Sequence, residues 1–360
     1  MLVGNSNDQD FLLKQLKAFD KSKAGVKGIV DAGITKIPPI FVHPPRHPGQ
    51  LTQTEFIIPV VDLADVAVGM RRHAEVVDGV RRAAESVGLF QVVNHGIPKK
   101  ILDEILQAMH GFHELPKEVK AEFYSKDLMR KVRFSGNYNL GTSGFAEWRD
   151  SFLCEMSSET VDPQELPEVC RDITMVYSQY AQNLGATLFE LLSDALGLKP
   201  DHLVGLDCAK GHLIVGNYYP PRPEPDLTMG HVKHTDLSFL GILLQDNINA
   251  LQLLYQNQWI DVPPMPGALV VNIGDFLQLI SNNKYISVTH RVLAKKEGAR
   301  VSVGCFFRHI SPGRLYEPIK ELTSEDNPPV YCGTTVGDYR TGHYQKGLIN
   351  GVSGLEYLKL

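Results

Sequence analysis

Several features are scarce or absent in this chain of 360 residues, and each absence excludes a class of protein. Its five cysteines are scattered and never form a Cys-x-x-Cys pair, so neither a zinc knuckle nor a disulfide framework is indicated. No apolar run approaches the roughly 20 residues that cross a bilayer, and the polar N-terminus lacks a secretory signal pattern. We therefore expect a soluble protein of the reducing cytoplasm with no membrane partner.

Basic residues are not gathered into a stripe. The 36 lysines and arginines are interspersed with 41 acidic residues, which gives a formal net charge of −5. A nucleic-acid partner is not expected, because neutralising a phosphate backbone requires a concentrated positive surface. The sequence also shows no internal repeats and no exposed heptads. Nothing in it demands a dimer, and we expect a monomer.

A hydrophobic content of 43% is enough for a substantial core, and its spacing predicts helices in the first part of the chain. Apolar residues recur at intervals of three or four over residues 10–20, 76–87, 98–112 and 166–196. Gly197 follows the last of these helices in the usual terminating position. On the third helix, His110 and His113 flank the apolar stripe and are expected to be solvated.

Short β-rich runs separated by turn residues dominate from residue 213 onward, after two earlier strands at 57–62 and 89–93. This pattern is typical of a sandwich or jelly roll. We expect an N-terminal helix and arm (1–55), a helical region packing on the barrel (56–205), a jelly-roll domain (206–320) and a C-terminal tail or lid (321–360). The later strands are predicted at residues 213–219, 234–245, 251–262, 267–273, 286–294 and 301–310.

Metal-binding chemistry is concentrated in this β-rich part. Successive side chains of a strand point to opposite faces, so His234 and Asp236 share a face, as do Arg300 and Ser302. With His290, the first pair supplies two imidazoles and one carboxylate, which is the facial triad of iron(II) sites. The alternative is a set of core polar residues satisfied by the backbone. Strand alternation predicts that His231, three residues before His234, points away.

The order of these residues resembles the plant-type 2-oxoglutarate- and iron(II)-dependent dioxygenases, from about residue 56 to 327. The opening of the chain is further similar to the subgroup of aminocyclopropane-carboxylate oxidase homologues, which includes desacetoxyvindoline 4-hydroxylase-like enzymes. The first resemblance implies a double-stranded β-helix, or jelly-roll, core backed by helices, with a mixed α and β N-terminal region. The two resemblances rest on His234-x-Asp236, His290, Arg300-x-Ser302 and Asn217-Tyr218-Tyr219-Pro220, and on segments 16–20, 24–28 and 37–38.

The resemblance also implies a reaction and roles for its residues. The triad would hold Fe(II), and Arg300 with Ser302 would bind the far carboxylate of 2-oxoglutarate, with further contacts from Asn217 and Tyr219. The guanidinium group of an arginine suits this task because it is planar and always charged. Dioxygen would be consumed and succinate and carbon dioxide released, with hydroxylation or O-demethylation of a small plant specialised metabolite. Ascorbate would keep the iron reduced.

Strand alternation extends the inner face from Arg300 toward the substrate. Phe306 and Arg308 fall on that face, and Arg308 suggests a substrate with an anionic or polar group. We expect Phe134, Tyr138 and Phe239 to line the pocket as well, with core packing as the alternative for the aromatic residues. Two other functions remain open: an aminocyclopropane-carboxylate-oxidase-type enzyme that uses ascorbate in place of 2-oxoglutarate, and a noncatalytic small-molecule binder on the same barrel.

Overall fold

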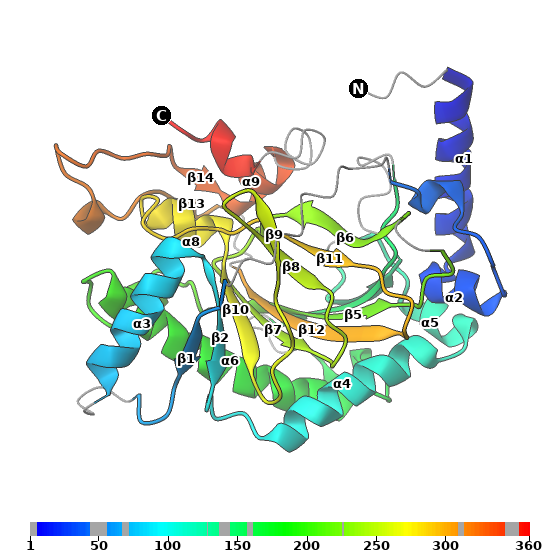
Figure 1. The fold of residues 1–360 in the computed structure, drawn as a ribbon, viewed down its shortest axis with the longest axis horizontal. Coiled ribbons are helices and arrows are strands. Elements are labelled where there is room, and N and C mark those ends of the chain that lie inside the picture. Colours follow the sequence, from blue (N-terminus) through cyan, green and yellow to red (C-terminus); the bar gives the residue numbers. More distant parts are fainter. Residues whose placement is uncertain are drawn as a thin grey trace.

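Two β-sheets pack face to face and enclose the interior of the protein (Figure 1). The structure, a computed structural model, describes residues 6–43, 56–66, 72–127, 129–136, 145–156, 161–224, 227–308, 313–342 and 353–360. Within these ranges the strands form an eight-stranded sheet, a four-stranded sheet and a small two-stranded sheet. This confirms the jelly-roll architecture backed by helices that the sequence predicted.

The strand order places residues that are distant in the chain side by side. The eight-stranded sheet has the order β1 (Val60–Asp62), β2 (Leu89–Val93), β10 (Leu269–Ile273), β7 (Leu240–Gln245), β12 (Arg300–Phe307), β5 (His212–Tyr219), β4 (Asp150–Met156), β3 (Val132–Ser135). The four-stranded sheet has the order β6 (Met229–His234), β11 (His290–Leu293), β8 (Leu251–Tyr255), β9 (Gln258–Asp261). The third sheet pairs β13 (Leu315–Tyr316) with β14 (Thr334–Thr335).

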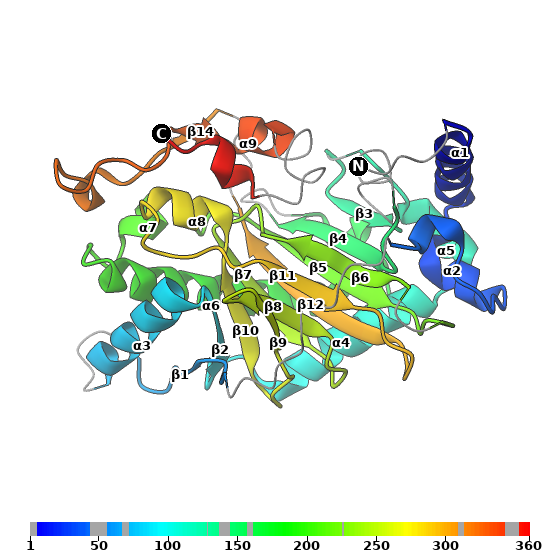
Figure 2. The same ribbon diagram turned by 45° about the horizontal axis from the view of Figure 1, so that its top comes forward.

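Helices surround the sheets, and three of them cover the outer face of the large sheet (Figure 2). These three are α3 (His73–Ser86), α4 (Lys99–Glu114) and α6 (Arg171–Ala195). The other helices are α1 (Ser6–Ser22), α2 (Gly25–Asp31), α5 (Lys117–Phe123), α7 (His202–Gly205), α8 (Asp275–Ile280) and α9 (Val336–Gly342). Short 3-10 turns are η1 (Pro39–Phe41), η2 (Pro163–Glu165), η3 (Lys320–Leu322) and η5 (Gly354–Tyr357).

The central strand β12 separates the helix-covered core from the interior of the barrel. Val301, Val303, Cys305 and Phe307 belong to the large buried cluster shared with the helices. The residues that alternate with these along the strand, including Arg300, Ser302 and Phe306, line a cavity on the opposite face. The period-two alternation predicted for this strand is therefore confirmed. Packing on the helix side is tight, because a Cβ added at Gly185 of α6 would lie 2.0 Å from the ring of Phe307.

The four predicted helices are confirmed as α1, α3, α4 and α6, but one prediction about α4 was wrong. His113 is fully buried rather than solvated, because α4 packs on the sheet over a wider face than its apolar stripe. The His113 Nε2–H donates to the carbonyl of Gly216 at 3.1 Å, and the imidazole stacks on Tyr218 with ring centroids 5.1 Å apart. Burial lowers the pKa of His113 to about 3.

Two predicted strands are each divided in the structure. The run 234–245 is broken because His234 ends β6 in the four-stranded sheet, whereas β7 begins at Leu240 in the eight-stranded sheet. The chain crosses from one sheet to the other between these residues. The run 251–262 is a hairpin of β8 and β9. Its turn residues Gln256 and Asn257 have φ values of 48° and 62°, and positive φ at both central residues is typical of tight hairpin turns.

Residues before the jelly-roll region contribute to the same framework. Strands β1 to β4 extend the large sheet at both edges, and β4 presents the buried Asp150 to the N-terminal arm. The Asp150 carboxylate accepts hydrogen bonds from the backbone N–H groups of Val26 and Lys27 at 2.7 and 2.8 Å, which attaches α2 to the barrel. The division of the chain at residues 55, 205 and 320 remains a prediction.

None of the described helices combines the length and the apolar character that crossing a bilayer requires.

Candidate metal and cosubstrate site

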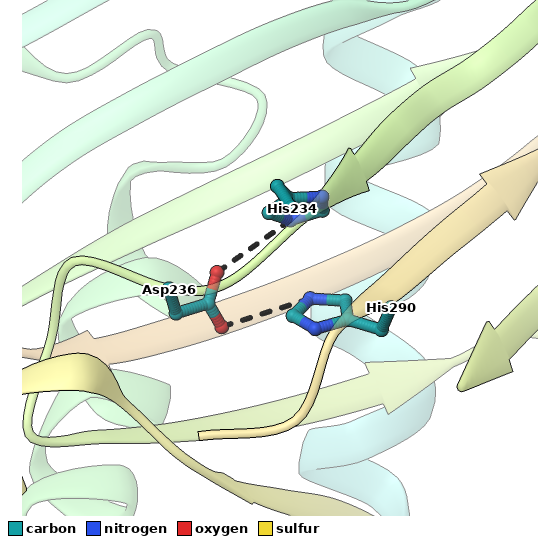
Figure 3. A group of neighbouring side chains, drawn as sticks. All are labelled: His234, Asp236 and His290. Atoms are coloured by element: carbon teal, nitrogen blue, oxygen red, sulfur yellow. Dashed lines mark ion pairs between the residues drawn. The ribbon is translucent and has the colours of Figure 1, made fainter. Parts of the chain in front are cut away.

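The three predicted metal ligands converge at one point between the sheets (Figure 3). His234 ends β6, His290 begins β11, and the two residues are direct partners in the antiparallel pairing of these strands. Asp236 lies on the connection that leads to β7. The ligand atoms lie within 4.8 Å of one another, and no other such group of histidine, cysteine or acidic residues occurs in the described ranges.

Both imidazoles are oriented by the backbone. The Nδ1–H of His234 donates to the carbonyl of Val232 at 2.8 Å, and that of His290 donates to the carbonyl of Val288 at 3.1 Å. Each Nε2 atom therefore presents a lone pair toward Asp236, at 3.6 Å from Oδ1 for His234 and 3.8 Å from Oδ2 for His290. These separations are too long for hydrogen bonds but suit three donor atoms around one cation at about 2 Å.

The electrostatics of the cluster also suit a divalent cation. Burial, together with the neighbouring His231 and His290, lowers the pKa of His234 well below its usual value. Neutral imidazole is the form that binds metals. The carboxylate of Asp236 is fixed by a hydrogen bond from the Asn272 amide to Oδ2 at 2.7 Å, in the manner of outer partners that orient metal ligands. The donor set therefore fits iron(II).

The prediction that His231 points away from this cluster was wrong. The register between β6 and β11 shifts, since His234 pairs with His290 but His231 pairs with Val292. This bulge inserts one extra residue into β6 and returns His231 to the face of His234. The two imidazoles stack with centroids 3.7 Å apart, and both residues line the cavity.

A buried carboxylate that the sequence did not indicate holds His231 in place. The Nδ1–H of His231 donates to Oε1 of Glu147 at 2.6 Å, and Arg149 contacts Oε2 of Glu147 at 2.8 Å. Burial alone would raise the pKa of Glu147, but His231 and Arg149 hold it at about 2. Glu147 therefore stays ionised and orients a nonligand histidine beside the metal cluster.

The predicted cosubstrate residues lie together on the opposite wall of the cavity. Arg300 pairs with Tyr219, and Ser302 pairs with Asn217, on the neighbouring strands β12 and β5. Arg300 is only 1% exposed, and its guanidinium group lies 5.1 Å from the centre of the Tyr219 ring. Asn217 Oδ1 accepts a hydrogen bond from the hydroxyl of Ser151 at 2.8 Å, which fixes its side chain.

All hydrogen bonds that the structure gives the Arg300 guanidinium go to uncharged acceptors. Its Nε donates to the carbonyl of Ile248 at 3.2 Å, Nη1 to the hydroxyl of Ser302 at 3.2 Å and Nη2 to Oε1 of Gln245 at 2.9 Å. Asp246 lies nearby but accepts instead from the backbone N–H of Val301 at 2.5 Å. A buried cation of this kind is suited to a carboxylate ligand.

The five residues predicted to contact the substrate lie in different parts of the structure. Phe306 and Arg308 line the cavity, as the alternation of β12 predicted. Phe239 does not, because it is fully buried against Phe276 and Tyr316 in the core beside the helices. Phe134 is also fully buried elsewhere, and Tyr138 lies outside the described residues. The expectation for Phe134 and Phe239 was therefore wrong.

Three arginines that sequence reasoning missed also line the cavity, which has a volume of about 260 Å³. Arg133 lies on β3 and Arg149 directly precedes β4, both in the part of the chain that was expected to be helical. Arg340 lies on α9 in the C-terminal segment. No local spacing connects these residues to the metal ligands, because only the folding of distant segments brings them to one wall.

Comparisons with known proteins agree with this geometry. One family model, described as the 2OG-Fe(II) oxygenase superfamily, matches residues 210–309, and a second, described as the N-terminal region of a non-haem dioxygenase in morphine synthesis, matches residues 58–172. Deacetoxyvindoline 4-hydroxylase of Catharanthus roseus is 50% identical over 346 residues, which cover 93% of this chain and 86% of that protein. The 1-aminocyclopropane-1-carboxylate oxidase homolog 1 of Arabidopsis thaliana is 48% identical, with 96% of each chain covered.

A solved structure is similar over nearly the whole chain. The crystal structure of JOX2 in complex with 2OG, Fe and JA superposes with a TM-score of 0.82 at 26% sequence identity. The similarity covers 93% of this chain and 97% of that one. Both the N-terminal region and the barrel therefore have counterparts in this solved structure.

Proposed function

Because the chain belongs to the 2-oxoglutarate- and iron(II)-dependent oxygenase superfamily, we propose that it hydroxylates a small plant specialised metabolite. The observation that carries the proposal is the convergence of two imidazoles and one carboxylate opposite a buried arginine. The name of the Catharanthus roseus relative describes a hydroxylase, which supports hydroxylation as the reaction. O-demethylation is the same chemistry directed at an O-methyl carbon.

In this proposal His234, Asp236 and His290 hold the iron. When bound, iron(II) and 2-oxoglutarate would together activate dioxygen: one oxygen atom would enter the substrate and the other would enter succinate, which forms as 2-oxoglutarate loses its C1 carboxylate as carbon dioxide. The chain itself positions the reactants. Backbone carbonyls hold the imidazoles, and Asn272 holds the carboxylate, so that the three donor atoms are preorganised for one face of the metal.

We assign the far carboxylate of 2-oxoglutarate to Arg300 and the hydroxyl of Ser302. Asn217 and Tyr219 complete this end of the cavity from the adjacent strand. The charges support the assignment, since iron(II) and the arginine together carry three positive charges, and Asp236 and the dianionic cosubstrate carry three negative charges. Apolar side chains, among them Leu243, Leu251 and Val292, also line the cavity.

The proposal is tested by incubating the purified protein with Fe(II), ascorbate, dioxygen, 2-oxoglutarate and a library of plant metabolites. We expect one or more metabolites to be consumed with an equal amount of succinate formed. Substrate oxidation that needs ascorbate but forms no succinate would instead support the aminocyclopropane-carboxylate-oxidase-type alternative. A protein that binds no metal under anaerobic conditions would support the noncatalytic binder.

A single substitution tests the metal assignment separately. Asp236→Ala removes the only anionic ligand and should abolish both turnover and stoichiometric metal binding, while the circular dichroism spectrum stays that of the wild type. Asp338→Ala provides a matched control, because Asp338 is an exposed carboxylate outside the cavity. An active Asp236→Ala enzyme would contradict the site assignment.

We also propose that the protein works as a cytoplasmic monomer with no nucleic-acid partner. All five cysteines are free, four of them are buried, and burial raises the pKa of the Cys305 thiol, which fits a reducing compartment. The interspersed charges support the absence of a nucleic-acid surface. Sedimentation of the purified protein at a mass of about 40.0 kDa would agree with a monomer, and twice that mass would contradict it.

A further inference from the structure

Arginine side chains are concentrated on the wall of the cavity. Asp236 is the one carboxylate among the lining residues in the described ranges. Because a guanidinium group cannot lose its charge at physiological pH, every arginine there must be balanced by an acid of the protein or of a ligand. The lining arginines are Arg133, Arg149, Arg300, Arg308 and Arg340.

Acidic residues of the protein pair with two of these arginines. Glu147 contacts Arg149 at 2.8 Å, and Glu155 accepts hydrogen bonds from both Nε and Nη2 of Arg308. Both glutamates are at least nine-tenths buried. These two pairs add no net charge to the cavity.

Iron and 2-oxoglutarate do not balance Arg340. In the proposed complex the charges of iron(II), Arg300, Asp236 and the cosubstrate cancel, so the formal charge of Arg340 remains in excess. The stretch that follows Arg340 in the chain, 343–352, contains no aspartate or glutamate. An anionic group of the second ligand would restore neutrality.

Arg340 is held at the cavity by its neighbour in α9. The hydroxyl of Tyr339 donates to Oδ2 of the buried Asp275 at 2.7 Å, and the Thr235 hydroxyl donates to the same oxygen at 3.0 Å. Thr235 stands between the metal ligands His234 and Asp236. The C-terminal segment, which lies beside α8 in Figures 1 and 2, is therefore attached directly to the metal-binding connection.

The attachment leaves the guanidinium group of Arg340 available. Arg340 is half-buried and makes no hydrogen bond or ion pair with any residue of the described ranges. Partial removal of a cation from water is unfavourable when the cation has no partner. An incoming anion therefore gains more binding free energy from Arg340 than from a solvated arginine on the surface.

The attachment of α9 lies near the Phe307 end of β12, because Ile273, two residues before Asp275, pairs with Leu240, and Leu240 pairs with Phe307. Eight residues along one extended strand correspond to roughly 26 Å, so Arg300 and Arg308 mark opposite ends. Side chains between them on the wall include Leu153, Leu213 and Phe306, which are apolar. The cavity thus has an apolar middle between the Arg300 end and the opposite end, near which α9 is attached.

From these observations we propose that Arg340 binds a carboxylate of the organic substrate, which is therefore a small, mainly apolar organic acid. The inference rests on the proposed function, since it concerns the second ligand of the same cavity. Arg340 acts as a specificity residue: it selects anionic over neutral molecules and fixes which end of the substrate faces the metal.

Binding experiments without oxygen test this proposal. The full-length protein is loaded with Mn(II) and 2-oxoglutarate and titrated calorimetrically with benzoate, cinnamate and decanoate, and with their neutral methyl esters. We expect at least one acid to bind at least tenfold more tightly than its ester. Arg340→Gln should remove most of that preference while the affinity for 2-oxoglutarate stays within twofold of the wild type.

A matched control removes the same charge from the surface of the C-terminal segment. Lys320→Gln alters an exposed residue outside the cavity and should leave the preference for acids unchanged. The proposal is overturned if no acid in the panel binds, if esters bind as tightly as acids, or if Arg340→Gln keeps the full preference. Failure of the proposed function is a different result, because the wild type would then not bind Mn(II) and 2-oxoglutarate.

Discussion

Replacing Arg300 by methionine gives the sharpest test of the cosubstrate assignment. The guanidinium group is 1% exposed and makes hydrogen bonds only to the neutral oxygens of Ile248, Ser302 and Gln245. A bound carboxylate would add charge-assisted hydrogen bonds, each contributing about 1.5–3 kcal/mol. Methionine fills a similar volume without charge, so we expect a loss of about 3 kcal/mol in binding, which weakens the affinity for 2-oxoglutarate on the order of 100-fold.

The assay for this change is anaerobic calorimetric titration of the Mn(II)-loaded protein with 2-oxoglutarate. Urea unfolding of the ligand-free Arg300→Met variant checks that it still folds, because the substitution also removes a cation close to the buried Asp246. Arg82→Met, at an exposed position of α3, controls for the loss of an arginine as such. The reasoning is refuted if Arg300→Met binds 2-oxoglutarate within threefold of the wild type.

Two further predictions concern stability. The pKa of His113 falls from an ordinary value of 6.5 to about 3 on folding, so its stabilising contribution is complete above pH 6.5 and is lost progressively as the pH falls toward 3. Urea unfolding at pH 7 and pH 5 should show about 2 kcal/mol less acid destabilisation for His113→Gln than for the wild type, and equal losses would contradict this. Gly185→Ala should cost about 1–3 kcal/mol of unfolding free energy because its Cβ would overlap the ring of Phe307, whereas Gly205→Ala, with open space around it, should cost much less.

Part of the metal cluster and of the cavity wall was predicted from signals within single segments, whereas His290 meets His234 only through the pairing of β11 with β6. His234 and Asp236 stand two residues apart, and the inward face of β12 follows from strict alternation between Arg300 and Arg308. A strand of period two determines which side chains share a face whatever the rest of the chain does. The helices on the outer face were predicted for the same reason, since their apolar spacing is a property of single segments.

The errors arose wherever a position depends on a partner in space. His231 faces the metal cluster because β6 has a bulge against β11, and a bulge is defined only by the pairing of two strands. His113 is buried because α4 meets the sheet, and Phe239 belongs to the core because the chain changes sheets before β7. None of these events leaves a periodic signal in the segment itself.

The sequence by itself determined the chemistry of this protein: two histidines, an aspartate and an arginine whose types and order specify an iron and 2-oxoglutarate site on a β-rich framework. Only the tertiary structure decided which arginines of the rest of the chain line the cavity, because Arg133, Arg149 and Arg340 come from three separate segments. Local spacing fixes which side chains share one strand face. Convergence of distant segments follows from the packing of whole elements, which no short stretch of sequence encodes.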